Sequence, residues 1–346
     1  MQWQPDRGLQ LRMAFSIVLL AVLPLAFVYT MSWAIANIIV PLAEMLFETR
    51  MDWQLSVSVP VILAVTLLGL AFQFLFGDRF ALHSVGATRV ERSEFPDLYR
   101  RLDRLSQQVD LPTPRLAVSP SAVPNAFATG RSPSAATVMV TEGLLDALED
   151  DELDAVLAHE LAHIKNRDVV VMSLAYLLPS FTYAVAVGAY TLLGGLWNIV
   201  GHFHHSDTDD ARPLIAVIVL FVVSAIVTIL ISALFWMGSF LLFRLLSQYR
   251  ERAADRGAVR ITGDPLALAG ALRAIDSEMT RLPDRDLREL DGGVEALYIS
   301  PLDIPVFTDG DDALISRDLF PESHPPTEVR IEALKELAAQ QESIED

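Results

Sequence analysis

The sequence predicts a mainly α integral membrane protein with four transmembrane helices, arranged as two hairpins, and a cytoplasmic α+β domain that contains a small antiparallel sheet. Three observations lead to this fold class: long stretches without charge, an uneven distribution of arginine, and a change from helical to extended residue patterns elsewhere. Hydrophobic residues make up 52% of the 346 residues, and their excess is concentrated in the uncharged stretches. The chain is therefore expected to divide between the bilayer and a water-exposed domain.

Four stretches contain no Asp, Glu, Lys or Arg: 13–43, 55–77, 169–205 and 213–243. Each holds at least the ~20 apolar residues that a helix needs to cross a bilayer, and the first two spans are expected at about 13–40 and 55–77. The alternative, buried helices of a soluble protein, would require unusually long core helices. The first stretch is too long for a removed signal peptide and lacks a small-residue cleavage site.

Arginine residues indicate which segments face the cytoplasm. Arg7 and Arg12 precede the first stretch, whereas the loop 44–54 holds only Arg50 among its acidic residues. By the positive-inside rule the N-terminus is cytoplasmic, and so are the arginine-rich segments that follow the second and fourth stretches. The expected order is a first hairpin, the first part of the cytoplasmic domain, a second hairpin and the second part of that domain, at 1–80, 81–168, 169–243 and 244–346.

Between the two hairpins the residue pattern changes along the chain. Leucines at 98, 102 and 105 recur at helical spacing and predict an amphipathic helix that ends at Pro112. The next helix is expected to start at 149–151 and, with no Pro or Gly before Pro179, to continue into the third span. Short extended segments separated by Pro, Ser and Gly predict the antiparallel sheet: 115–118, 125–129 and 136–141.

Within that second helix lies His159-Glu160-Leu161-Ala162-His163. Residues four apart share one face of a helix, so His159 and His163 can direct their imidazoles at one metal ion, while Glu160 can reach a water on that ion. This His-Glu-x-x-His pattern is the signature of zinc metalloproteases. The motif alone leaves open an exposed helix with two solvated histidines.

Charge and cysteine content limit the possible partners and ligands. The formal net charge is −18, and Lys165 and Lys335 are the only lysines, so the surface should repel nucleic acid. The absence of cysteine leaves His and carboxylate side chains as metal ligands. No GxxxxGK phosphate-binding loop occurs, so no nucleotide is expected as a partner.

Two further clusters could bind metal. Glu251 and Asp255 share one face of the helix that follows the fourth stretch, although their spacing equally suits a surface helix with Arg–carboxylate pairs. The turn between the third and fourth stretches, which carries three histidines at 202–205, is interpreted as a solvated external turn because it faces away from the His-Glu-x-x-His helix. The acidic segment 283–323 shows little periodicity and is expected to be a long loop.

Four stretches together resemble the M48 family of membrane metallopeptidases, and most closely its HtpX-like heat-shock proteases: 125–130, 157–168, 250–255 and 324–331. The resemblance implies a gluzincin-type domain with one Zn²⁺ per chain, held by His159, His163 and Glu251. It also implies that Glu160 is the general base and that Asp255 orients a ligand imidazole. His324 would donate to the oxyanion, although a turn histidine before a helix cap is the alternative.

The resemblance further implies an edge strand for an extended peptide, formed by Asn125, Ala126, Phe127 and Ala128. The expected function is zinc-dependent hydrolysis of peptide bonds in misfolded or damaged membrane proteins, by a multi-pass protein of the cell membrane. The partners would be protein or peptide substrates and the lipid bilayer. Alternatives are a membrane scaffold or chaperone with a vestigial zinc site, and an intramembrane zinc protease. Charged residues on both sides of the motif disfavour the intramembrane protease.

Overall fold

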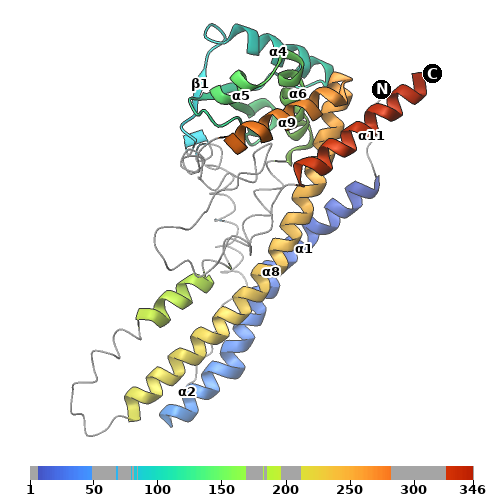
Figure 1. Cartoon of the computed structure of the whole chain (residues 1–346). Coiled ribbons are helices and arrows are strands. Elements are labelled where there is room, and N and C mark those ends of the chain that lie inside the picture. The colour runs from blue at the N-terminus through green and yellow to red at the C-terminus, as the bar shows by residue number, and fades with distance from the viewer. Residues whose placement is uncertain are drawn as a thin grey trace. The chain divides into compact units, whose positions relative to one another are not determined.

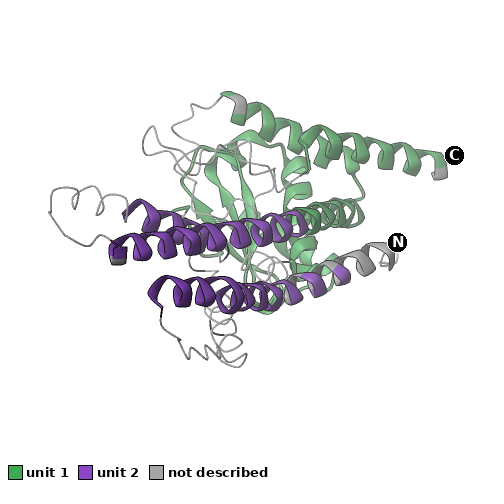
Figure 2. Cartoon of the chain, turned by 90° about the horizontal axis from the view of Figure 1, so that it is seen from below, with its two compact units in different colours: residues 1–13, 72–173, 244–346 green, residues 14–71, 174–243 purple. Residues whose placement is uncertain are grey.

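The computed structural model describes residues 7–48, 68, 79, 82–83, 85–168, 182, 185–195, 212–281 and 325–345. Figure 1 shows the course of the chain through these segments. The chain divides into two compact units, which Figure 2 colours separately. The first comprises Met1–Met13, Phe72–Ser173 and Arg244–Asp346, and the second comprises Ala14–Ala71 and Leu174–Phe243.

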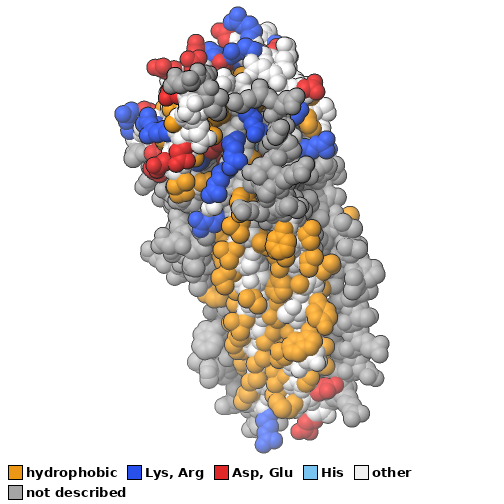
Figure 3. All heavy atoms as spheres, turned by 90° about the vertical axis from the view of Figure 1, so that its right-hand side faces the viewer, with side chains coloured by type: hydrophobic (Ala, Val, Ile, Leu, Met, Phe, Trp, Pro, Cys, Tyr) orange, Lys and Arg blue, Asp and Glu red, His pale blue; other side chains and the backbone are white. Residues whose placement is uncertain are grey.

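The second unit consists of apolar helices. Most of α1 (Arg7–Ala34) belongs to it, as do a π-helical turn (Ile35–Ile39), α2 (Val40–Phe47) and the first part of α8 (Arg212–Thr262). Many of their large hydrophobic side chains are exposed, for example Tyr29 and Leu230, and Figure 3 shows such side chains gathered into one apolar surface. An exposed apolar surface of this kind fits a lipid environment rather than water.

Two helical segments are long and apolar enough to cross a membrane, Val22–Phe47 and Leu214–Thr262. They correspond to the first and fourth predicted spans. The predicted span at 55–77 lies almost wholly outside the described residues, and that at 169–205 is described only at residue 182 and at 185–195, which includes the short apolar helix Val185–Gly195. The described part of the chain therefore supports two of the four predicted spans.

Helix α8 is far longer than a membrane requires. Its 51 residues extend over roughly 75 Å at about 1.5 Å per residue, against a hydrocarbon core of about 30 Å. The composition changes at Arg244, after which charged residues recur on the helix. The apolar part of α8 thus continues without interruption into a polar part that carries Glu251 and Asp255.

The first unit contains a four-stranded sheet. Its strands are β1 (Thr88–Val90), β2 (Arg115–Ser119), β3 (Ala126–Thr129) and β4 (Thr137–Thr141), in the order β1-β2-β4-β3. The predicted antiparallel sheet is wrong in one respect, because β2 and β4 are parallel while the other two pairs are antiparallel. Strand β4 lies between β2 and β3, and every side chain of both β3 and β4 is buried.

Five helices complete this unit: α4 (Pro96–Gln108), α5 (Glu142–Ala147), α6 (Asp150–Asn166), α9 (Pro265–Arg281) and α11 (Thr327–Glu345). Helix α6 contacts β3, α4 and α9, so it lies at the centre of the packing. Buried leucines from the sheet and helices form the core, among them Leu102, Leu116, Leu157, Leu161 and Leu272.

The two ends of α6 are fixed by specific interactions. At its start, Glu149 and Glu152 form a capping box, which agrees with the predicted start at 149–151. At its end, Arg167 adopts a left-handed conformation with φ 59°, and its N–H bonds the carbonyls of His163 and Ile164. The prediction that this helix continues unbroken into the third span is therefore wrong, because the left-handed residue ends it at Asn166.

The central position of α6 leads to a prediction about stability. Leu157→Ala removes a fully buried side chain and should lower the free energy of unfolding by about 2–5 kcal/mol. Leu266→Ala, on the exposed side of α9, should change it by less than about 0.5 kcal/mol. Thermal unfolding in detergent, followed by circular dichroism, measures both variants. Equal shifts would show that Leu157 does not belong to a packed core.

Candidate metal centre

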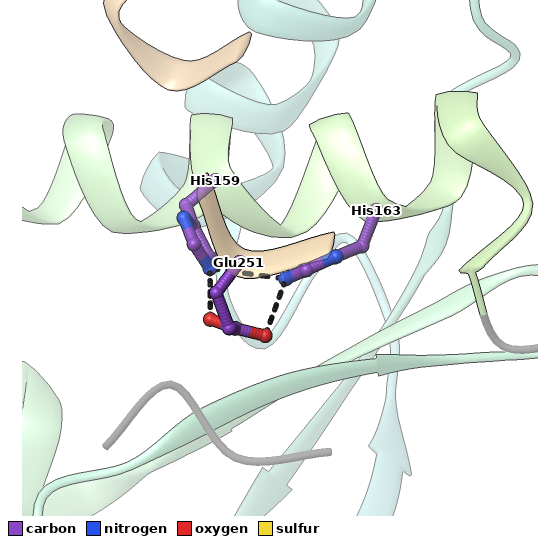
Figure 4. Close-up of side chains that lie close together, drawn as sticks. All are labelled: His159, His163 and Glu251. Carbon is purple, nitrogen blue, oxygen red and sulfur yellow. Dashed lines mark hydrogen bonds and ion pairs between the residues drawn. The ribbon is translucent and has the colours of Figure 1, made fainter. Parts of the chain in front are cut away.

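Three side chains from two helices converge in the first unit. His159 and His163 lie one turn apart on α6, and Glu251 approaches them from α8 (Figure 4). Their potential ligand atoms all lie within 4.8 Å of one another, and the three side chains are buried. The two Nε2 atoms are 3.0 Å apart, and the Glu251 carboxylate lies 3.4 Å from one and 3.5 Å from the other.

These distances fit a tetrahedral metal ion. Ligand bonds of about 2.0–2.1 Å to such an ion place neighbouring ligand atoms roughly 3.3 Å apart. The observed separations of 3.0, 3.4 and 3.5 Å bracket that value. The donor set of two imidazoles and one carboxylate suits a divalent transition metal, and three protein ligands leave a fourth position for water or substrate.

Both histidines have a carboxylate on the nitrogen that faces away from the centre. His159 Nδ1 lies 3.1 Å from Asp255 Oδ1, and His163 Nδ1 lies 2.7 Å from Asp168 Oδ2. A proton on Nδ1 would be shared with the carboxylate, which leaves the Nε2 lone pair directed at the centre. On Glu251, Oε1 accepts a hydrogen bond of 2.8 Å from Arg250 Nη2.

Arg330 of α11 connects this arrangement to the end of the chain. Its Nε and Nη2 donate to the two oxygens of Asp255 at 3.0 and 2.6 Å, and its Nη1 lies 3.7 Å from Glu251 Oε2. The side chain is buried, so the guanidinium balances carboxylate charge that would otherwise be costly to bury. A buried series of contacts thus extends from Arg330 through Asp255 to His159.

Burial determines the electrostatics of the site. It lowers the pKa of His163 well below its ordinary value, so this imidazole is neutral and available as a ligand. Burial also disfavours a charge on His159, but Asp255 and Glu251 outweigh it and raise the pKa of that imidazole to about 9. Binding of a divalent cation would displace that proton, because a metal ligand must be deprotonated.

Glu160 lies next to the centre and has the features of a general base. Burial raises the pKa of its carboxyl group to about 7, while His159 and the backbone N–H of Ala128 act in the opposite direction. Within the described part of the chain, neither carboxylate oxygen makes a hydrogen bond of good geometry. A buried carboxylate in this condition is expected where a water or a substrate belongs.

Strand β3 presents backbone groups beside the same centre. The N–H of Thr141 donates to the carbonyl of Asn125, so the antiparallel register turns the polar backbone groups of Ala126 and Ala128 away from β4. Phe127 pairs with Met139 on β4. The side-chain amide nitrogen of Asn125 is buried and makes no hydrogen bond within the described residues. The N–H of Ala126 donates to Asn125 Oδ1 at 2.8 Å and that of Ala128 faces Glu160, so the outward carbonyls of these buried residues are left without a partner on β4.

The structure describes some of the predicted site residues but not all of them. It brings together His159, Glu160, His163, Glu251 and Asp255, and it places 125–128 on the outermost described strand. His324, the histidines at 202–205 and the acidic segment 283–323 lie outside the described residues.

Sequence reasoning assigned no role to Asp168, Arg250 or Arg330, although all three lie inside stretches that carried the family resemblance. Helical spacing could not indicate that Asp168 lies near His163, because Asp168 follows the end of α6 at Asn166. Arg330 lies 75 residues after its partner Asp255.

A helix with His-Glu-x-x-His, a carboxylate from a later helix and an adjoining edge strand define a peptidase of the HExxH class. The family model described as Peptidase family M48 matches residues 92–338, and the chain belongs to this family. The resemblance that the sequence indicated is thereby confirmed.

Close relatives support this assignment along almost the whole chain. "Protease HtpX homolog" of Moorella thermoacetica is 36% identical over 340 residues, which cover 97% of both chains. "Protease HtpX homolog 2" of Methanosarcina mazei is 37% identical over 336 residues, again 97% of both. Among solved structures, S. mikatae Ste24p aligns with 92% of this chain and 67% of its own, at a TM-score of 0.47 and 18% identity.

The contacts of Arg330 lead to a prediction. Arg330→Met should weaken metal retention by about 10–100-fold, because Asp255 loses its bidentate partner and no longer fixes the imidazole of His159. Arg330→Lys should recover part of the loss, since it keeps the charge but not the fork of donors. Metal content after dialysis against graded chelator concentrations measures the effect, with exposed Glu328→Gln as the control. Retention equal to that of wild type in both Arg330 variants would contradict the positioning role.

Proposed function

We propose that this M48 peptidase is a membrane-bound, zinc-dependent endopeptidase that hydrolyses misfolded or damaged membrane proteins. The observation that carries the proposal is the convergence of His159, His163 and Glu251, each of which also has a neighbouring charged side chain in contact with it. One Zn²⁺ per chain fits this donor set, with the fourth position left for water. Zinc bound there supplies a Lewis acid that polarises a peptide carbonyl and makes water more acidic.

The protein's own residues then perform the proton transfers. Glu160, whose pKa burial raises to about 7, takes a proton from the attacking water and later delivers it to the leaving amine. Asp255 and Asp168 keep the two imidazoles in the orientation and tautomer that the site requires. His324 is proposed to donate to the developing oxyanion, as its place in the family pattern implies.

Substrate recognition is proposed to rest on backbone pairing with β3. The outward carbonyls of Ala126 and Ala128 can accept hydrogen bonds from an extended peptide, and the buried amide nitrogen of Asn125 can donate to it. The N–H of Ala126 already donates to Asn125 Oδ1 at 2.8 Å. Backbone pairing depends little on side chains, so it accepts many sequences. This tolerance suits a peptidase that removes damaged proteins of varied sequence.

The proposed topology is two hairpins in the cell membrane, with the N-terminus, the catalytic domain and the C-terminus in the cytoplasm. The arginine distribution and the two long apolar helices support it. The catalytic domain would comprise 81–168 and 244–346, separated by the second hairpin at 169–243.

Two alternatives fit the structure less well. An intramembrane protease would bury the motif helix in the bilayer, but α6 exposes Asp151 near its start and Lys165 near its end. A chaperone with a vestigial metal site would have no need for the unsatisfied, buried Glu160 beside a complete ligand set. Both features favour catalysis in a domain outside the bilayer.

Replacement of the general base tests the mechanism. Glu160→Gln keeps the size of the side chain but cannot accept the proton, so proteolysis should fall by at least about 10²-fold. Bound metal should remain near one equivalent, since Glu160 is not among the three ligands. Cleavage of an unfolded protein in detergent and metal analysis measure the two effects. Unchanged cleavage would refute the assigned base.

Removal of the metal tests its requirement. Dialysis against a chelator should abolish cleavage, and stoichiometric Zn²⁺ should restore it in wild type but not in Glu160→Gln. Far-UV circular dichroism before and after dialysis checks that the protein remains folded. Full activity of the metal-free enzyme would exclude a zinc mechanism. Peptide hydrolysis would then have to depend on other residues of the protein.

A further inference from the structure

A shallow hollow adjoins the metal centre on one side. It is lined by the end of β3, by the segment that follows, and by the last turn of α6. Its lining residues include Thr129 and the predicted metal ligand His163, so the hollow adjoins the edge strand and one side chain of the centre. Its volume of about 20 Å³ is enough for a small polar group or one or two waters.

Two arginines, Arg131 and Arg167, line this hollow from opposite elements. Both side chains are exposed, and neither has an ion-pair partner among the described residues. Other arginines of the same unit are paired, such as Arg101 and Arg104 with Asp154. Two exposed arginines at one small hollow, both without an ion-pair partner in the described part of the chain, form an uncommon feature in a chain whose net charge is −18.

The backbone holds both arginines in fixed positions. Gly130 has φ 131°, and a Cβ there would lie 2.7 Å from Ala136 Cα, so the segment after β3 is packed tightly. Arg167 occupies the left-handed end of α6, a position where glycine or asparagine is usual. The sequence thus carries a large charged side chain where the backbone favours a small one, which points to a use for that side chain.

The position of the hollow relative to β3 indicates which part of a substrate would reach it. Ala128 lies beside Glu160, so the bond to be cleaved lies near this residue. A peptide that pairs antiparallel with β3 runs from Arg131 toward Ala128, and three residues of strand extend about 10 Å. The hollow would therefore accept the side chain of the second or third residue before the cleaved bond.

We propose that Arg131 and Arg167 form a specificity subsite for an acidic side chain, Asp or Glu, at the second or third substrate residue before the cleaved bond. This inference rests on the proposed function, and it adds a charge preference to otherwise sequence-tolerant backbone pairing. The guanidinium groups bind a carboxylate with charge-assisted hydrogen bonds. The adjoining wall carries the metal ligand His163, so a filled subsite places the substrate against the centre.

The test uses the full-length, zinc-loaded protein in uncharged detergent. A peptide that wild type cleaves is synthesised with Asp, Asn or Lys at each of the four residues before the mapped cleavage site, and kcat/KM is measured for each. Asp should be preferred over Asn by roughly fivefold at the second or third position, as expected for exposed ion pairs, and Lys should be disfavoured. Raising KCl from about 0.1 to about 1 M should reduce the preference, because it shortens the Debye length from about 10 to about 3 Å.

The double variant Arg131→Asn/Arg167→Asn should lose the preference, and asparagine suits the left-handed backbone at 167. Arg273→Asn removes one positive charge from the exposed side of α9, by the same replacement, and should keep the preference. The ratio of Asp to Asn rates within one variant does not depend on the fraction of folded enzyme, so a loss of stability cannot imitate the effect.

Three outcomes would overturn the proposal. Equal Asp and Asn rates at every position in wild type would remove the subsite while leaving the zinc peptidase intact. An unchanged Asp-to-Asn ratio in the double variant, together with weaker binding to phosphatidylglycerol vesicles, would assign the two arginines to lipid phosphate. Absence of zinc-dependent cleavage of any peptide would refute the proposed function, and the subsite with it.

Discussion

The buried carboxylate of Asp255 is the interaction on which the site depends. It accepts two hydrogen bonds from Arg330 on α11 and lies 3.1 Å from His159 on α6, while it is itself part of α8. Three helices that are far apart in the sequence are therefore held by one side chain. A buried carboxylate is tolerable only when its charge is balanced and its oxygens are satisfied, and Arg330 and His159 meet both conditions. Glu251 lies one turn before Asp255 on the same face of α8, so the contacts that hold Asp255 also place Glu251 opposite the two imidazoles.

The unsatisfied groups of the site are as informative as the satisfied ones. Within the described structure, both oxygens of Glu160 and the amide nitrogen of Asn125 make no hydrogen bond of good geometry, and neither do His159 Nδ1 and Asp168 Oδ1. The two histidine–carboxylate pairs still place an oppositely charged or polar partner within 3.1 Å, whereas the oxygens of Glu160 and the amide nitrogen of Asn125 have no such side-chain partner in the described part of the chain. Glu160 of α6 faces the backbone of Ala128, and Asn125 accepts a hydrogen bond from the N–H of Ala126 at the start of β3. Leaving such groups unpaired costs stability, so their position beside an edge strand and a ligand set is best explained by an extended substrate and a water that would satisfy them. The carboxylates beside the histidines thus position the ligands, whereas Glu160 and Asn125 are available to water and substrate.

Local patterns in the sequence predicted most of the helices and strands, but not the pairing of the strands or the contacts between distant side chains. The His-Glu-x-x-His helix, the amphipathic helices and three of the four strands follow from periodicity and turn residues, because these depend on neighbours within a few positions. The parallel pairing of β2 with β4 does not follow from such patterns, since it joins strands that are not consecutive in the sequence. Strand β1 was missed because Thr88–Val90 is short and largely exposed. The pairing of Arg330 with Asp255 joins residues 75 positions apart, and only the packed tertiary structure brings them together.

The end of α6 shows how one backbone turn can serve both the ligands and the substrate. Had the helix continued, Asp168 would lie five residues beyond His163 and point roughly 140° away from it. The left-handed conformation of Arg167 ends the helix and lets Asp168 return to within 2.7 Å of the His163 imidazole. The same residue also lines the hollow beside Thr129, so the orientation of a ligand and the proposed charge preference arise from a single turn. A substitution at 167 that moves the backbone would therefore disturb the position of Asp168 as well as the subsite. A substitution that keeps the left-handed backbone separates the two effects, because it removes the charge and leaves the carboxylate beside His163.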